Sequence, residues 1–168
     1  MNADELRSRQ GPLKTRYKED PQAAFQTLRA EAVLNVSELS CVVPTPGPLA
    51  LAGLHPAAGG DGTFACSGDM LLQALAGCAG VTLLAVATAL QIPVRGGTVL
   101  VEGDLDFRGT LGVAREVPVG FLAIRVVFHL EGEVTDEQRE SLRKLSERYC
   151  VVAQTLRCPV SVVVKAQA

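Results

Sequence analysis

The sequence has 168 residues, of which 48% are hydrophobic and 20% are charged, a composition that excludes an intrinsically disordered chain and is typical of a globular protein. Its net charge of -2 and its aromatic content of 4% argue against two classes of nucleic-acid binder, those attracted to phosphate backbones and those that stack bases on aromatic rings. We therefore expect a single globular domain that binds no nucleic acid.

Residues 1–22 are polar and rich in charge, which predicts an irregular N-terminal arm ahead of one domain over residues 23–168. The first residues carry charge where a secretory signal would need an apolar core, so we expect a cytoplasmic protein. Strands are predicted at Phe25–Val33, Glu38–Val43 and Leu49–Gly53. The segment His55–Thr63 is rich in glycine and predicts a loop.

The segment Met70–Leu90 contains no charged residue and predicts a helix that is apolar on all sides. Ser67 is expected to cap it, and Asp69 suits the positive end of its dipole. At about 1.5 Å per residue the segment is about 30 Å long, so a transmembrane helix is an alternative. Its many Ala and Gly residues and the amphipathic strands that follow favour instead a buried central helix, and we expect no contact with a membrane.

Two long strands are predicted after this helix. Apolar and polar residues alternate over Thr98–Phe107 and again over Leu122–Leu130, which indicates a hairpin with one face more polar than the other. The segment Thr135–Gln138 matches a capping box, and an amphipathic helix is expected to continue from it to about Leu156.

A last strand is predicted at Val160–Val164, after Pro159 has ended the second helix. The predicted order is therefore βββ-α-ββ-α-β, which is an α+β fold with antiparallel sheets around a central buried helix.

Five cysteines are present, an odd number that argues against a framework of structural disulfides in a reducing compartment. No CxxC motif occurs, so any redox chemistry has to use cysteines that are distant in the chain. His55 and His129 are too few and too far apart for a closed zinc site, and we expect no bound metal.

Cys78 lies in the middle of the first helix and on the side predicted to face the core. A cysteine in such a position is most simply a small buried hydrophobic residue. The dipole of its own helix cannot activate it, because that effect fades within the first turn and Cys78 lies nearly three turns from the N-terminus. A reactive Cys78 would need an arginine or a hydrogen-bond donor from elsewhere in the fold. Cys150, near the end of the second helix, has the same two interpretations.

The segments Ser67–Gly80 and Glu147–Leu156, each carrying one cysteine, together resemble the OsmC/Ohr superfamily of thiol peroxidases. The resemblance covers roughly residues 25–165, and the segment Gly103–Gly112 resembles a connecting strand of one branch. It implies an intertwined homodimer with the active site at the subunit interface.

The resemblance also implies a reaction cycle. The Cys78 thiolate would attack an organic or hydrogen peroxide and become a sulfenic acid, which Cys150 would resolve as a disulfide. An external dithiol, lipoyl-linked in the hydroperoxide branch, would then reduce this disulfide, so no bound cofactor is implied. The alternative is a binding or scaffold dimer of the same fold with unreactive cysteines.

Three positions differ from the hydroperoxide branch. Val151 follows the second cysteine, where that branch has proline, and Gly68 stands where the branch has an acidic residue that holds the activating arginine. Asp69 is therefore the candidate for the acidic role. The Gly-Gly-Arg turn of the branch is also missing, which leaves Arg29 as a candidate for the cation that stabilises the thiolate, although a solvated strand residue is the simpler interpretation. Cys66 is a candidate third redox sulfur, although an ordinary half-buried thiol is the simpler interpretation.

Overall fold

The computed structural model describes residues 2–4, 8, 11, 19, 33–35, 40–43, 50–111 and 115–167. In these residues the strands are β1 (Val33–Asn35), β2 (Ser40–Val43), β3 (Ala50–Gly53), β4 (Ala65–Cys66), β5 (Gly96–Asp104), β6 (Ala123–Glu131) and β7 (Val160–Gln167). The helices are the 3-10 turn η2 (Pro56–Ala58) and the α-helices α2 (Ser67–Ala89), α3 (Phe107–Thr110), α4 (Asp136–Tyr149) and α5 (Val151–Thr155). The α+β class and the central helix are as predicted.

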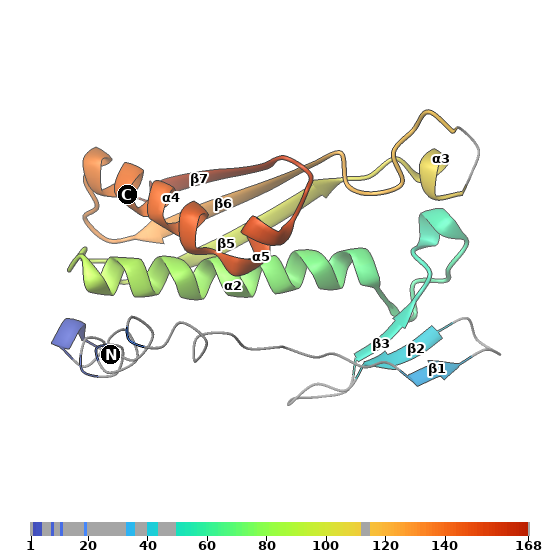
Figure 1. The fold of residues 1–168 in the computed structure, drawn as a ribbon, viewed down its shortest axis with the longest axis horizontal. Coiled ribbons are helices and arrows are strands. Elements are labelled where there is room, and N and C mark those ends of the chain that lie inside the picture. The colour runs from blue at the N-terminus through green and yellow to red at the C-terminus, as the bar shows by residue number, and fades with distance from the viewer. Residues whose placement is uncertain are drawn as a thin grey trace.

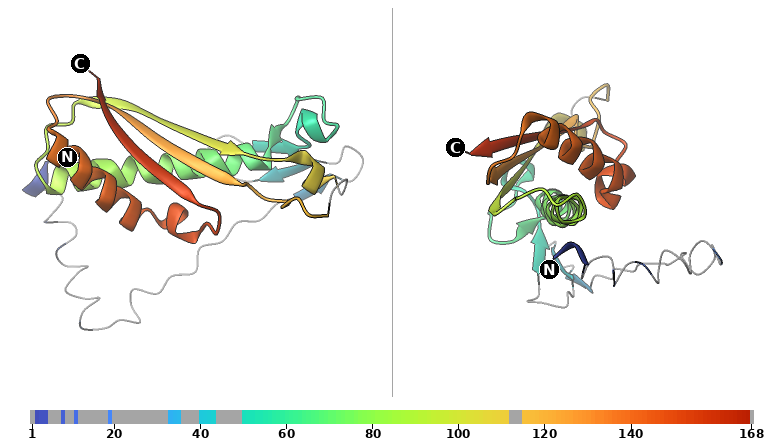
Figure 2. Two further views of the ribbon diagram at one scale, coloured as in Figure 1. Left: turned by 90° about the horizontal axis from the view of Figure 1, so that it is seen from above. Right: turned by 90° about the vertical axis from the view of Figure 1, so that its left-hand side faces the viewer.

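Helix α2 runs along the length of the molecule, with β5, β6 and β7 beside it and the sheet β1-β2-β3-β4 near its N-terminal end (Figure 1). Viewed along its axis, α2 lies against the sheet β5-β6-β7 and the helices α4 and α5 (Figure 2). Helix α2 contacts β5 and helix α4 contacts β7, and the two helices also contact each other.

The predicted hairpin is confirmed, because β5 pairs antiparallel with β6 from Gly96 opposite Glu131 to Asp104 opposite Ala123. The expectation of purely antiparallel sheets is wrong at two places. Strand β7 runs parallel to β6, since α4 and α5 form a crossover that brings the chain back to the same end of the sheet. Strand β4 likewise pairs parallel with β3.

The predicted strand Phe25–Val33 lies outside the described residues except for Val33, where β1 begins. The other two early strands are present over their described residues as β2 and β3. The division into an arm over residues 1–22 and one domain over residues 23–168 stays a prediction, since most of the arm lies outside the described residues.

Helix α2 begins earlier than predicted. Ser67 is its first residue and does not cap it, because β4 leads directly into the helix and Cys66 occupies the N-cap with extended dihedral angles (φ -73, ψ 136). Asp69 lies in the first turn, as expected.

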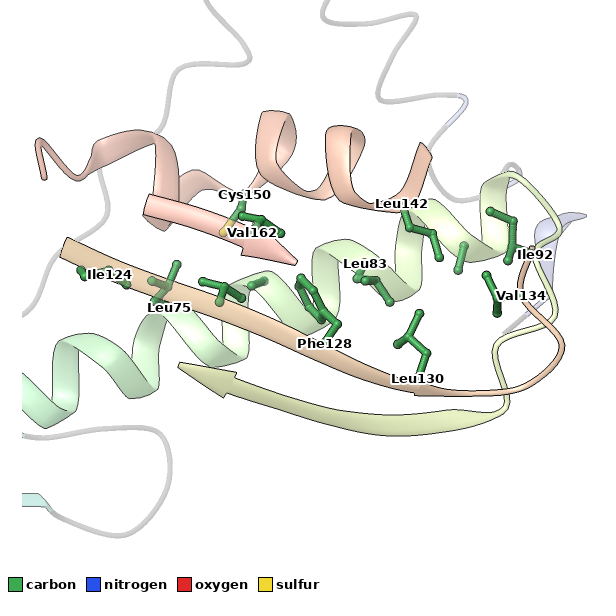
Figure 3. Close-up of a cluster of buried hydrophobic side chains, with 13 residues drawn as sticks. Leu75, Leu83, Ile92, Ile124, Phe128, Leu130, Val134, Leu142, Cys150 and Val162 are labelled. Atoms are coloured by element: carbon green, nitrogen blue, oxygen red, sulfur yellow. The ribbon is translucent and has the colours of Figure 1, made fainter. Parts of the chain in front are cut away.

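One face of α2 is buried. The buried positions recur every four residues, at Leu75, Ala79, Leu83 and Ala87, and they form one core with β6, β7 and α4 (Figure 3). On another face Val81 and Leu84 are 71% and 54% exposed. Among the described residues α2 is the helix that is long and apolar enough to cross a membrane by length and composition, with a mean hydropathy of 2.0.

Helix α4 starts with the predicted capping box. The Thr135 hydroxyl accepts from the Gln138 N–H at 3.2 Å, and the Gln138 side chain accepts from the Thr135 N–H at 3.0 Å. The expectation of one helix to Leu156 is wrong, because the helix breaks at Cys150, whose ψ of 105 is extended. A separate short helix, α5, follows.

Candidate functional site

The cysteines predicted to act together lie on two neighbouring helices. Cys78 comes from the middle of α2 and is half-buried, whereas Cys150 lies at the break between α4 and α5 and is only 1% exposed. Cys150 lies in the core beside Val162 (Figure 3). The two thiols lie close enough for each to shift the pKa of the other, although they are far apart in the chain.

The break at Cys150 places backbone donors beside both sulfur atoms. The N–H groups of Val151 and Val152 lie close enough to the sulfur of Cys78 to lower its pKa, and those of Ala153 and Val152 act in the same way on Cys150. In an uninterrupted helix these N–H groups would bond to carbonyl groups one turn back, so they are available only because the helix breaks here.

The pKa of the Cys78 thiol lies below its ordinary value. Burial is the largest single influence and raises this pKa, but several hydrogen bonds to the sulfur oppose it and together outweigh it. In decreasing order these come from the Val152 N–H, the Cys150 thiol, the Thr82 hydroxyl and the Val151 N–H. Cys78 is thus the thiol of the pair that ionises more readily.

The pKa of the Cys150 thiol is raised instead. Burial contributes most, and both the hydrogen bond to Cys78 and the negative charge on Cys78 raise it further, while the N–H groups of Ala153 and Val152 act against them. When the pair loses its first proton, that proton therefore leaves Cys78, and the Cys150 thiol keeps its own.

Thr82 and the amides of Val151 and Val152 are contributors to the site that sequence reasoning did not identify. Thr82 follows Cys78 by one helical turn, so its spacing was a usable signal. The amides left no signal, since they become donors only where the helix breaks.

Of the two other predicted site residues, Asp69 is among the described residues and Arg29 is not. Asp69 is exposed in the first turn of α2, about 14 Å along the axis from Cys78 at about 1.5 Å per residue, so the structure does not bring it to the thiols within one chain.

Cys66 and Cys158 are the other cysteines whose side chains the structure describes. Cys66 is at the start of α2, about 18 Å along the axis from Cys78 at about 1.5 Å per residue. It lines a hollow of about 390 Å³ that also includes His55 and Phe107, whose rings stack at 4.8 Å. Cys158 is half-buried against the core. In the described part of the chain no three His, Cys, Asp or Glu residues are grouped so that they could hold a metal ion.

A small cavity of about 10 Å³ lies between α2, α4 and the sheet, behind Cys150. Its wall includes Leu75, Phe128, Val162 and Ser146. The Ser146 side chain is buried, and its hydroxyl has no hydrogen-bond partner among the described residues.

Comparison with known proteins decides the family. The model of the OsmC-like protein family matches residues 60–165, which is more than half of the chain and includes both Cys78 and Cys150. The chain belongs to the OsmC-like family. The resemblance inferred from the two cysteine segments is thereby confirmed at the level of the family.

Solved structures agree on the fold. An OsmC-like protein from Mycoplasma pneumoniae is 18% identical, with a TM-score of 0.70 over 85% of this chain and 99% of its own. An organic hydroperoxide resistance protein OsmC from Legionella pneumophila is 16% identical, with a TM-score of 0.65 over 86% of this chain and 99% of its own. An organic hydroperoxide resistance protein from Elizabethkingia anophelis is 14% identical, with a TM-score of 0.59 over 84% of this chain and 97% of its own. No curated protein matches the chain.

Proposed function

We propose that the protein is a thiol-dependent peroxidase that reduces organic or hydrogen peroxides, with Cys78 as the nucleophile and Cys150 as the resolving cysteine. The observation that carries the proposal is the contact between two thiols whose pKa values are shifted in opposite directions. Thiolates, not thiols, attack peroxides, so the sulfur with the lowered pKa is the attacking one. Two solved structures of the same fold are named as organic hydroperoxide resistance proteins, which supports this class of substrate.

In the first step the Cys78 thiolate attacks one oxygen of the peroxide and the O–O bond breaks. Cys78 becomes a sulfenic acid and is oxidised, while the other oxygen leaves as an alkoxide or hydroxide. The leaving oxygen takes up the proton of the Cys150 thiol and departs as an alcohol or water. Cys150, which donated to Cys78 before the reaction, is thus converted to a thiolate next to the sulfenic acid.

In the second step the Cys150 thiolate attacks the sulfur of the Cys78 sulfenic acid. A disulfide forms as the S–O bond breaks, and the hydroxide that leaves takes up one proton from solvent and becomes water. An external dithiol of the lipoyl type then reduces the disulfide by thiol–disulfide exchange, and the dithiol is itself oxidised to its disulfide. We propose this cycle for a cytoplasmic protein with no bound cofactor.

Thiol counting after peroxide treatment tests the proposal. The reduced protein is mixed with one equivalent of cumene hydroperoxide or hydrogen peroxide, and its free thiols are counted in denaturant. We expect the loss of two thiols in the unmodified protein, none in Cys78→Ser, and a trappable sulfenic acid in Cys150→Ser. If the unmodified protein keeps all its thiols, the cysteines are unreactive and the scaffold interpretation holds.

We further propose that the protein acts as a homodimer in which a second copy covers the exposed face of α2. This face carries Ala74, Gly77, Val81 and Leu84 without a charged side chain, and two of these are large apolar residues that are more than half exposed. Exposed apolar surface of this kind favours association.

Light scattering at several protein concentrations measures the oligomeric state and so tests the dimer. Val81→Glu would place a charge in the covered face and should prevent association. We expect a dimer for the unmodified protein and a monomer for Val81→Glu. Val119→Glu, a change at another exposed apolar position, should leave the dimer intact. Recovery in the soluble fraction without detergent tests the alternative in which α2 spans a membrane.

A further inference from the structure

The carbonyl of Glu147 loses its usual partner at the helix break. In a continuous helix it would accept from the N–H of Val151, four residues on, but that N–H faces the sulfur of Cys78. The side chain of Gln154 fills the position, because its Nε2 donates to the Glu147 carbonyl at 2.8 Å. A side chain on α5 therefore replaces the backbone bond that the break removes.

The break is sharply limited. The last regular bond of α4 runs from the Cys150 N–H to the Ser146 carbonyl at 3.0 Å, and the first bond of α5 runs from the Gln154 N–H to the Cys150 carbonyl at 3.0 Å. Val151 and Val152 are the first two residues of α5, and their N–H groups lie between these two bonds without a backbone partner among the described residues. Each of these N–H groups can bond to a carbonyl one turn back, which would continue the helix, or point at the Cys78 sulfur. It cannot do both at once.

The hydrogen bond from Gln154 lies at an exposed position, so a Glu147 carbonyl without it would be free to bond either to water or again to the Val151 N–H. The second choice restores the continuous helix. In the continuous helix the Val151 N–H would bond to the Glu147 carbonyl and no longer to Cys78. The next N–H, that of Val152, would also turn away from Cys78 to a carbonyl one turn back. A donor that already bonds to the Glu147 carbonyl makes the continuous helix less favourable, because the Val151 N–H would have to displace it. Gln154 is the described side chain that does so.

We propose that Gln154 is a positioning residue for Cys78: by occupying the Glu147 carbonyl it keeps the helix broken, so that the N–H groups of Val151 and Val152 stay directed at the Cys78 sulfur. The inference rests on the proposed function only in treating Cys78 as the reacting thiol. Its physical content is a competition between two acceptors, a carbonyl and a sulfur, for the same N–H groups.

In the part of the chain that the structure describes, charged side chains do not account for the lowered pKa of Cys78. On α2 the segment Met70–Leu90 has none, and α5 has none. On α4 the Glu147 carboxylate pairs with Arg143 at 3.0 Å, and Arg148 lies over the Tyr149 ring at 5.5 Å. On β5, which also packs on α2, Glu102 and Asp104 pair with Arg125 of β6.

The groups that reach Cys78 are therefore two amides, the Thr82 hydroxyl and the Cys150 thiol. Losing the amides should raise the pH at which Cys78 ionises.

Gln154→Met tests the proposal, since methionine is similar in length and helix propensity but cannot donate. The readout is the pH dependence of Cys78 alkylation by iodoacetamide in the reduced protein, followed by mass spectrometry of the Cys78 peptide. We expect the midpoint to rise by about one pH unit, which makes alkylation about tenfold slower below the midpoint. Gln154→Lys restores a donor and should stay within about twofold of the unmodified protein.

The matched control is Thr155→Val. Its hydroxyl bonds to the Val151 carbonyl at 2.8 Å, so this change perturbs α5 but not the Glu147 carbonyl. If Gln154→Met alkylates with the unmodified midpoint, or if Thr155→Val or Gln154→Lys shifts it equally, the proposal is overturned. Should Gln154→Met fail to show native circular dichroism, Gln154→Leu takes its place.

The alkylation assay contains no peroxide, so its result is independent of catalysis. A protein that consumes no peroxide but shifts its Cys78 midpoint in Gln154→Met would refute the peroxidase and retain the positioning role. If the protein consumes peroxide and Gln154→Met leaves the Cys78 alkylation midpoint unchanged, the peroxidase is supported and the positioning role of Gln154 is refuted.

Discussion

The buried hydroxyl of Ser146 allows a prediction whose sign runs against intuition. Its side chain is 2% exposed and lacks a hydrogen-bond partner among the described residues. A buried hydroxyl without a partner costs about 1–3 kcal/mol. Ser146→Ala removes that cost and gains about 0.5 kcal/mol of helix propensity.

The same change enlarges the cavity behind Cys150 by about one atom. At about 24 cal/mol per Å³ and an added volume of about 10 Å³, this costs only about 0.2 kcal/mol. We therefore expect Ser146→Ala to raise the free energy of unfolding by about 1–3 kcal/mol, and the melting temperature by roughly 2–4 °C for each kcal/mol.

Urea unfolding of the reduced protein measures the effect. The midpoint should rise with an unchanged slope, because the surface exposed on unfolding hardly differs. Ser141→Ala is the matched control, since Ser141 is half-buried on the same helix and its replacement gains only helix propensity. If Ser146→Ala is no more stable than Ser141→Ala, or is destabilised, the hydroxyl has a partner in solution and the reasoning is refuted.

Three further predictions concern the site, the core and the surface. Because the folded-state pKa of Cys78 is lowered, its alkylation should stay fast as the pH falls to values at which alkylation of the unfolded chain has slowed; equal pH profiles for the two states would contradict this. Phe128→Ala removes the ring of a residue that is 1% exposed, and urea unfolding should show a decrease of about 3–5 kcal/mol in the free energy of unfolding; a decrease below about 1 kcal/mol would show that the Phe128 ring is not packed in the core. Arg125→Gln breaks an exposed pair with Asp104, and thermal unfolding should change by less than about 1 kcal/mol; a larger loss would mean that this pair is buried in the assembly.

Local patterns in the sequence were sufficient for much of the fold. The hairpin of β5 and β6 follows from the alternation of apolar and polar residues, and the start of α4 follows from Thr135 and Gln138, because both signals depend on neighbouring residues alone. The direction of β7 could not be predicted in this way. It depends on the crossover by α4 and α5, and a short apolar strand such as Val160–Gln167 has the same composition in either direction.

The thiol pair was accessible to sequence reasoning only through the resemblance to a family. The spacing placed Cys78 on the inner side of its helix, and the same spacing is typical of an inert core residue. The end of α4 was predicted beyond its actual position because residues with helical periodicity continue past Cys150. Nothing in that periodicity indicates that two amides bond to a sulfur on another helix.

The position of Cys78 explains why the break is needed. A cysteine in the middle of a long helix has no free amide of its own helix nearby, because each one there bonds to a carbonyl one turn back. Donors for its thiolate must then come from another segment, and a continuous neighbouring helix would offer none. A neighbouring helix that ends at Cys150 and restarts at Val151 supplies two amides and a thiol at one point. The irregular backbone at Cys150 and the regular backbone at Cys78 are thus two parts of one arrangement, and the hydrogen bond from Gln154 to the Glu147 carbonyl is the local interaction that holds them together.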